Sequence, residues 1–543
     1  MRLALPIAAP VALCFILARP LVAQVDHAHH AEHLGRVVFP TSCRPAVQQR
    51  FERAMALLHS FWWEEGPRAF RAVAAADSSC AMAYWGLALS QWGNPFTSGP
   101  AGDGLREGAA AAARGLALGA RTARERGFLA ATGALYRDAG TVPNAHRLQA
   151  YSDTLARVYR DLPADPEVAM YYALSLVATA SPTDTSFTRQ RQAAAILNPL
   201  FRRFPEHPGL AHYIIHASDS PRLAALGLDA ARRYAQIAPS APHAQHMPSH
   251  IFVRLGLWDE TIAANQRSVD AGLAYARVQH LDGVSPDEFH ALDYMIYGYL
   301  QEGRDSLARQ ALAEGMAVTT LLSRDALVTN YNRVAMEARV PLERSDWAAA
   351  AALPVRAAGQ GGIGEALAHF TRGLGAARSG DTAQARAELA SLATIEAALA
   401  GQPGYNWSRI VGIERQAVAA WLDLAAGDTA AALHEAQAAA DREDVTAKHP
   451  VTPGELLPAR ELEADLLLTV GQYARARAAY DETLERAPGR ARSLFGAARA
   501  AALSGDAATA RARYQELLRL MEHADGARPE LGVARAFLAS SSR

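Results

Sequence analysis

The stretch GQYARARAAY at residues 471–480 is followed one repeat later by GDAATARARY at residues 505–514. Three positions match at a spacing of 34 residues: Gly471 with Gly505, Ala476 with Ala510, and Tyr480 with Tyr514. In an antiparallel helix pair, the glycine ends the first helix, the alanine lets the second helix pack closely, and the aromatic ring fills the gap to the next pair. A period of 34 residues is that of the tetratricopeptide repeat. This stretch therefore predicts a helical-repeat fold.

Shorter versions of the pattern extend this prediction to the rest of the chain. Related glycine-centred turns occur at residues 255–259, 302–305, 379–383 and 426–430. In the N-terminal half, Asp165-Pro166 marks a helix start, because proline suits the first helical turn. We expect an all-α, right-handed superhelix of roughly eight to eleven antiparallel helix pairs, arranged in two arrays with almost no β-structure.

The N-terminus has the features of a secretory signal peptide. Arg2 provides a short positive region, residues 3–18 are apolar, and Ala23 is a small residue before Gln24. We predict cleavage after residue 23, a periplasmic or secreted protein, and no membrane span in the mature chain. The alternative is an uncleaved signal that anchors the protein in the inner membrane.

Four further segments follow the signal. We predict a histidine-rich tail at residues 24–42, an N-terminal array at 43–357, a glycine-rich break at 358–364 and a C-terminal array at 365–543. Cys43 and Cys80 each precede a predicted helix, and an oxidising compartment allows them to form a disulfide. The alternative is a pair of buried thiols.

Charge and composition exclude several classes of protein. Lys+Arg is 54 and Asp+Glu is 55, a net charge of −1, so the chain has no overall positive field for nucleic acid. Half of the residues are hydrophobic, which excludes wholesale disorder. Lys448 is the only lysine, and the simplest interpretation of this bias toward arginine is a GC-rich genome.

The histidines gather between residues 205 and 290. His212 and His216 form an H-x-x-x-H pair, which recurs 34 residues later as His246 and His250. Residues four apart share a helix face, and a helix uses this spacing to give one metal ion two imidazoles. Pro248 lacks an N–H, so a helix can begin there and leave His246 on an irregular lead-in.

Counting from the turn glycines Gly256 and Gly303 places these side chains on the concave, groove-facing side of their helices. The predicted metal ligands are His212, His216, His243, His246, His250, His290 and Asp293. The predicted groove or ligand-binding residues are Tyr213, Arg254, Arg267, Tyr294 and Tyr297.

Three interpretations of this patch remain open. The first is a transition-metal site for Zn, Cu, Fe or Mn, with chemistry at a metal-bound water if one coordination position is open. The second is a metal-free groove that binds a peptide or a small acid, and the third is a set of histidines with structural hydrogen bonds. H-E-x-x-H is absent, because Tyr213 and Met247 stand where that motif has glutamate. The sequence therefore assigns no reaction.

The motifs HYIIHA at residues 212–217 and HMPSHI at 246–251 resemble those of a family of exported bacterial tetratricopeptide-repeat proteins. The block CAMAYWG at residues 80–86 adds to the resemblance, which spans about 43–303. It implies an α-solenoid and no reaction. We therefore predict an exported scaffold whose N-terminal groove carries a histidine-rich metal site. The alternatives are a metal-free module for a peptide or protein partner in the periplasm, and a metal-dependent enzyme.

Overall fold

The structure is a computed structural model that describes residues 32–97, 99–322, 326–356 and 362–540. The predicted signal peptide and His27, His29 and His30 lie outside the described residues, as does most of the predicted break at 358–364.

The described residues form one short 3₁₀ helix and 26 α-helices. In chain order they are η1 (Pro45–Val47), α1 (Gln48–His59), α2 (Gly66–Ala76), α3 (Ala81–Trp92), α4 (Gly102–Leu118), α5 (Ala123–Tyr136), α6 (Asn144–Asp161), α7 (Pro166–Ala178), α8 (Thr188–Arg203), α9 (Pro208–Ser218), α10 (Ala224–Ile237), α11 (Pro242–His246), α12 (Pro248–Arg254), α13 (Trp258–Val278), α14 (Pro286–Gln301), α15 (Asp305–Ala317), α16 (Ala326–Glu343), α17 (Trp347–Ala351), α18 (Ile363–Ser379), α19 (Thr382–Leu399), α20 (Trp407–Ala425), α21 (Thr429–Asp444), α22 (Ala459–Thr469), α23 (Tyr473–Arg486), α24 (Ala491–Leu503), α25 (Ala507–Leu520) and α26 (Pro529–Ser540).

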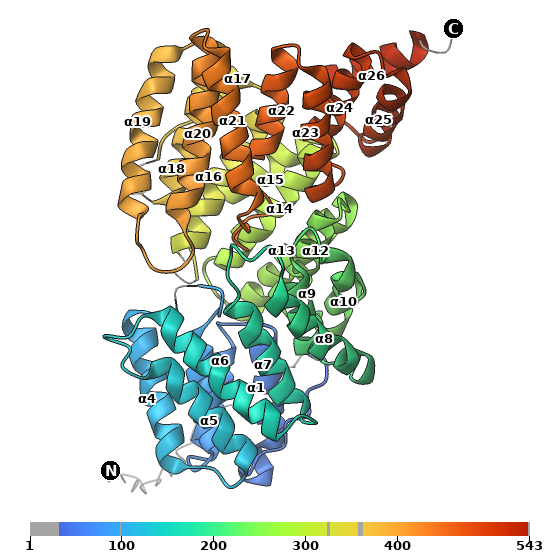
Figure 1. Cartoon of the computed structure of the whole chain (residues 1–543). Coiled ribbons are helices and arrows are strands. Elements are labelled where there is room, and N and C mark those ends of the chain that lie inside the picture. The colour runs from blue at the N-terminus through green and yellow to red at the C-terminus, as the bar shows by residue number, and fades with distance from the viewer. Residues whose placement is uncertain (1–31, 98, 323–325, 357–361, 541–543) are drawn as a thin grey trace, which may run out of the picture. The chain divides into compact units, whose positions relative to one another are not determined.

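Most helices pack against the helices next to them in the chain, as α18 to α21 do in Figure 1. Within the described ranges, the one β-type contact is a bridge between Val284 and Leu321. The prediction of an all-α fold of consecutive helix pairs is therefore confirmed, whereas the handedness of the superhelix stays a prediction.

The repeat residues act as their spacing predicts. Gly471 and Gly505 have φ of +80° and +84° at the turns, a conformation that costs little only for glycine. A methyl group on Gly496 would lie 2.1 Å from the ring of Tyr480, so helices α23 and α24 approach closely only because that position is glycine. The aromatic ring of one helix thus fills the space beside the small residue of the next.

His33 to Arg543 form one compact unit. Helices α16 and α17, which precede the predicted break, both pack directly against α18, which begins within it. The division into two arrays stays a prediction.

The described part of the predicted tail packs on the helices. The backbone of His33 bonds to Ser240, and that of Arg36 donates to the carbonyl of Glu206. Phe39 is fully buried, with its ring 5.3 Å from that of Phe51. The apolar residues of this segment explain why it joins the core although it follows a polar, histidine-rich stretch.

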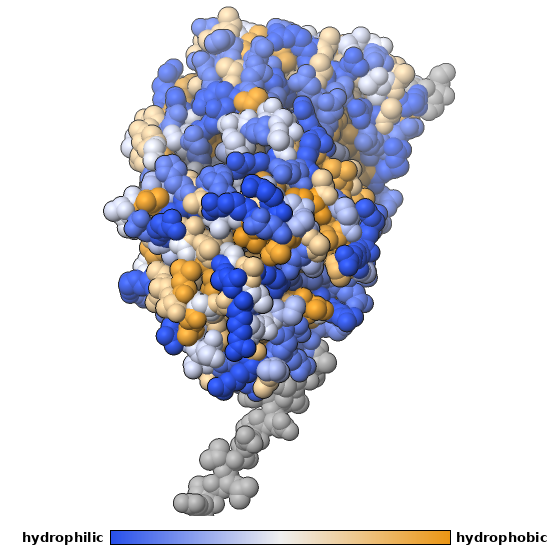
Figure 2. Space-filling view, turned by 60° about the horizontal axis from the view of Figure 1, so that its bottom comes forward, coloured by the Kyte–Doolittle hydropathy of each residue, from blue (hydrophilic) through white to orange (hydrophobic). Residues whose placement is uncertain are grey.

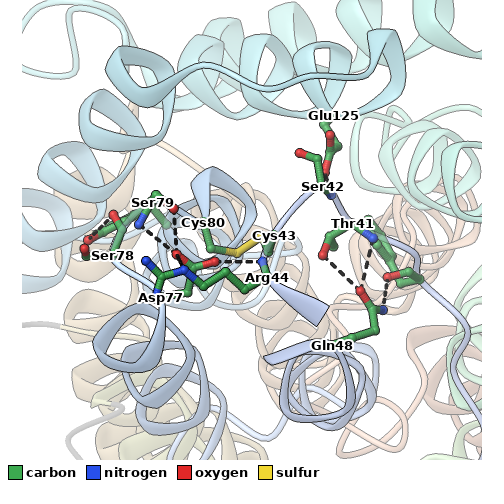
Figure 3. The surroundings of a disulfide bond; sticks show 12 residues. Thr41, Ser42, Cys43, Arg44, Gln48, Asp77, Ser78, Ser79, Cys80 and Glu125 are labelled. Atoms are coloured by element: carbon green, nitrogen blue, oxygen red, sulfur yellow. Dashed lines mark hydrogen bonds and ion pairs between the residues drawn. A yellow bond between two sulfur atoms is a disulfide. The ribbon is translucent and has the colours of Figure 1, made fainter. Parts of the chain in front are cut away.

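A disulfide joins Cys43, before η1, to Cys80, which caps α3 (Figure 3). Beside it, the Asp77 carboxylate accepts hydrogen bonds from the backbone N–H of Arg44 and from Ser79. The bridge closes a segment with a sequence separation of 37. Cross-linking of this length restricts the unfolded chain and so stabilises the fold.

Replacing both cysteines with serine is expected to lower the free energy of unfolding by about 3–4 kcal/mol. Denaturant unfolding of the oxidised protein and of the C43S/C80S variant measures the difference. Reducing the wild-type protein should reproduce most of the loss. Equal midpoints for all three samples would contradict a stabilising disulfide.

On the face shown in Figure 2, hydrophilic residues are mixed with smaller hydrophobic patches. No helix in the described ranges has the length and apolar character needed to cross a membrane.

Candidate metal site

Four helices bring six of the predicted ligands together. They are α9 with His212 and His216, α11 with His243 and His246, α12 with His250, and α14 with His290. Each of these helices has proline in its first turn. Pro248 separates α11 from α12, so His246 and His250 lie on two short helices. Their side chains still meet, because Met247 between them keeps helical backbone angles.

The six histidines form two triads, His212/His216/His243 and His246/His250/His290. In each triad, one ring nitrogen of every histidine lies within 4.8 Å of the other two. Three converging imidazoles are the ligand set of many transition-metal sites. We call the second group, His246/His250/His290, the inner triad and the first group the outer triad.

His212 and the inner triad are buried, whereas His216 and His243 are half-buried. The prediction that these histidines line a concave groove stays a prediction. His212 is 0% exposed, and His246 and His250 are each 1% exposed. Segments distant in the sequence cover them. The ring of Phe61, after α1, lies 4.4 Å from that of His212, and Tyr294 contacts the backbone of Thr452 from the loop before α22.

Phe61 has a φ of +51°, which is uncommon for a residue with a side chain. This conformation turns the chain at the end of α1, and the ring also stacks on His243 with the centroids 5.8 Å apart. Backbone strain of this kind persists where the surrounding structure imposes it, often at functional sites. A cleft lined by Phe61, Pro242, His243 and Tyr275 reaches the outer triad.

Outer hydrogen bonds orient three of the imidazoles. His212 Nδ1 lies 2.7 Å from the carbonyl oxygen of His59. His246 Nδ1 lies 2.6 Å from Asn265 Oδ1, and His250 Nδ1 lies 3.0 Å from Asp219 Oδ2. Metal-binding histidines are typically held in this way, with the second ring nitrogen donating to a carbonyl or a carboxylate.

These bonds fix the protonation of the inner pair. Asn265 Nδ2 donates to the carbonyl of Thr261 at 2.8 Å, so Asn265 Oδ1 is the atom that faces His246. His246 and His250 therefore both carry their proton on Nδ1, and each Nε2 presents a lone pair. The two Nε2 atoms are only 2.9 Å apart. Two lone pairs at this distance repel each other unless a cation lies between them.

The positive groups around Asp219 keep it ionised. Its carboxylate contacts Arg254 Nε at 2.9 Å and Lys448 Nζ at 3.4 Å. Burial alone would raise the pKa of Asp219, but Lys448, Arg254 and His250 outweigh burial and hold this pKa well below its usual range. Burial also lowers the pKa of Lys448 to about 8, against the attraction of Asp219. The side chain of Lys448, the single lysine of the chain, is 3% exposed and lies beside the cluster.

The histidines themselves are held neutral. Burial first, and then the neighbouring histidines, keep the pKa of His212, His216, His246 and His290 well below the usual value. Neutral imidazole is the form that binds a metal ion.

A third group, His59/Glu167/His207, also has ligand-like geometry, but its histidines are paired with the carboxylate of Glu167. His59 Nε2 and His207 Nε2 each lie 3.0 Å from a different oxygen of Glu167, and His59 Nδ1 lies 2.9 Å from the hydroxyl of Tyr213. Both oxygens of Glu167 are thus engaged, although His207 Nδ1 has no hydrogen-bond partner among the described residues. The predicted groove residue Tyr213 belongs to this network and is buried.

Asp293 does not join the histidines. Both of its oxygens pair with Arg339, with Oδ1 2.7 Å from Arg339 Nε, and both side chains are fully buried. Tyr297 accepts a hydrogen bond from Arg490 at 2.9 Å, and Arg267 donates to Gln245. Tyr294 lies against the inner triad, with its ring 4.9 Å from that of His246.

Sequence reasoning missed the groups that orient and cover the cluster, which are Asp219, Asn265, Phe61 and Lys448. Only Lys448 carried a signal, as the single lysine of the chain.

A second cavity is lined by residues of α16, α18, α20 and α21 and by the loop that carries Lys448. Tyr331, Tyr405, Trp407 and Glu414 are among its lining residues. Glu414 Oε2 is buried and has no hydrogen-bond partner among the described residues, and burial raises the pKa of this carboxyl to about 8.

At pH 9, the Glu414→Gln variant is expected to have a free energy of unfolding about 1–3 kcal/mol higher than that of the wild-type protein. At pH 4.5 the two proteins should be nearly equal in stability. The folded protein keeps a proton on Glu414 that the unfolded chain releases above its ordinary pKa of 4.5. The wild-type protein therefore loses stability as the pH rises from 4.5 toward the pKa of about 8 in the folded protein. Urea unfolding between pH 4.5 and 9 measures it. Parallel pH profiles for the two proteins would contradict a buried protonated carboxyl.

Comparisons with known proteins give no family. No protein-family model matches the sequence, and no curated protein matches it. Among solved structures, the human IFIT1 dimer with m7Gppp-AAAA is 12% identical, with 77% of this chain and 86% of that chain covered and a TM-score of 0.36. Yeast Tom70 is 10% identical, with coverages of 92% and 96% and a TM-score of 0.29. The TPR domain of P58(IPK) is 14% identical, with coverages of 70% and 100% and a TM-score of 0.22. With TM-scores this low, these similarities do not assign a function to this chain.

Proposed function

We propose that this protein is an exported helical-repeat protein that binds a transition-metal ion with His246, His250 and His290. The observation that carries the proposal is the facing pair of His246 and His250 lone pairs, 2.9 Å apart, with both Nδ1 protons committed to acceptors. A cation removes this repulsion.

The alternative cation is a proton shared by the two rings. Burial lowers the pKa of both His246 and His250, although the contact with Asp219 acts in the opposite direction on His250. Two nitrogens bound to one ion at about 2.0–2.1 Å lie roughly 3.0–3.4 Å apart, which is close to the spacing of the pair.

The third ligand is His290. Its Nδ1 is buried and has no hydrogen-bond partner in the described part of the chain. An all-imidazole set suits Zn or Cu better than Mn, which prefers oxygen ligands. Because Asp293 is paired with Arg339, the cluster offers no direct carboxylate ligand from that position.

Export is supported by the Cys43–Cys80 disulfide, because such bonds persist in oxidising compartments. Burial of His212 and of the inner triad leaves little room for a peptide beside these four histidines. A role in binding a protein partner elsewhere on the scaffold rests on the fold alone.

Titration of the metal-free full-length protein with Zn(II) or Cu(I), against a chelator of known affinity, tests the proposal. The protein should carry no histidine tag, and a variant with His27, His29 and His30 changed to Gln separates the tail from the cluster. We expect tight binding of at least one ion in both proteins. Binding that disappears with the tail histidines would contradict the proposal.

A further inference from the structure

We propose that the outer triad, His212/His216/His243, holds a second ion, so that the buried cluster is a two-metal centre. This inference rests on the proposed function of the inner triad and extends it.

The outer triad also presents ring nitrogens that could bind a cation. His243 Nε2 is buried and, among the described residues, lacks any hydrogen-bond partner. The His59 carbonyl accepts from His212 Nδ1, so His212 Nε2 presents a lone pair, and it lies 3.0 Å from His216 Nε2. A bound ion would use the unpartnered Nε2 of His243 together with the two facing Nε2 atoms of His212 and His216.

The two triads are in contact. Ring centroids of His243 and His246, one from each triad, are 6.0 Å apart, and those of His216 and His250 are 6.3 Å apart. Within the triads, His212 and His216 are 4.7 Å apart and His246 and His250 are 4.9 Å apart. The separation between the triads is therefore only slightly larger than that within them, and two ions would lie near enough to interact.

Charge indicates what else the centre binds. Six neutral imidazoles add no negative charge, and Asp219 is already paired with Arg254 and Lys448. Two divalent ions would leave several buried positive charges uncompensated, which is costly. We infer that the centre takes a small oxygen- or nitrogen-donor anion between the ions, as other two-metal sites do. The cleft that His243 helps to line gives such an anion a path.

The test is Cu(II) binding by the full-length protein, followed by electron paramagnetic resonance. The tail variant with His27, His29 and His30 changed to Gln serves as the background. We expect two equivalents of copper and a signal weaker than two independent ions would give, because the ions are coupled. Added azide should change the optical spectrum.

His243→Ala should bind one equivalent and give an ordinary signal that accounts for all of its copper. His216→Gln provides a second variant if His243→Ala folds poorly by circular dichroism, and His434→Ala, at an exposed site on α21, is the matched control. One equivalent in the wild-type background would overturn the second ion while leaving the proposed function intact. Two equivalents with full, uncoupled intensity would also overturn it, and no binding at all would overturn both.

Discussion

Replacing His246 and His250 with alanine is expected to abolish metal binding by the inner triad, with a loss of affinity of at least about a hundredfold. Two of its three ligands disappear, and the remaining ring of His290 cannot hold an ion in competition with a chelator. The outer triad does not replace the lost site, because His216 and His243 then lack the rings of His250 and His246 against which they pack. Elemental analysis after dialysis against a chelator measures the loss.

The matched control replaces the exposed His434 and His523 with alanine, which removes two imidazoles without touching the cluster. It should keep the wild-type metal content. Without metal, the double variant and its control should show similar helicity. The reason is that His246 and His250 repel each other in the metal-free wild-type protein, so their removal costs little. If the double variant keeps its metal and only melts earlier, the histidines are structural and the proposed function is wrong.

Asp293→Asn is expected to destabilise the fold by about 3–5 kcal/mol while leaving the metal content of the folded protein unchanged. The substitution leaves Arg339 buried without a negative partner. Its remaining hydrogen-bond acceptors are neutral: Thr452 Oγ1 and two backbone carbonyls. Denaturant unfolding and elemental analysis of the same samples separate the two effects.

Glu337→Gln is the matched control, because it breaks an ion pair with Arg356, whose side chain is half exposed. Its cost should stay below about 1 kcal/mol. An Asp293→Asn protein that remains stable but loses its metal would show that Asp293 is a ligand, as the sequence alone suggested.

The helical fold was predictable because its cause is local and periodic. The glycine, alanine and tyrosine at 34-residue spacing specify a turn, a close contact and a filled gap, and the structure shows each of them at Gly471, Ala476 and Tyr480. The same period aligned His212 with His246 and His216 with His250. These four histidines could therefore be named before any coordinates, and counting from Gly256 and Gly303 added His243 and His290.

Contacts between distant segments were not predictable in this way. Asp293 shares a helix with His290 and so looked like a ligand, but its partner Arg339 comes from α16, 46 residues later. Lys448 reaches Asp219 across a separation of 229 residues. The burial of the cluster depends on these long-range contacts, which follow from packing and leave no period in the sequence.

The most direct measurement is an anomalous-scattering map from crystals of the full-length protein loaded with Zn or Cu and collected at the absorption edge of that metal. The account predicts a peak between His246 Nε2 and His250 Nε2, within bonding distance of both and next to His290. A metal-loaded crystal with those two nitrogens still in contact, and with its anomalous peak elsewhere, would contradict it.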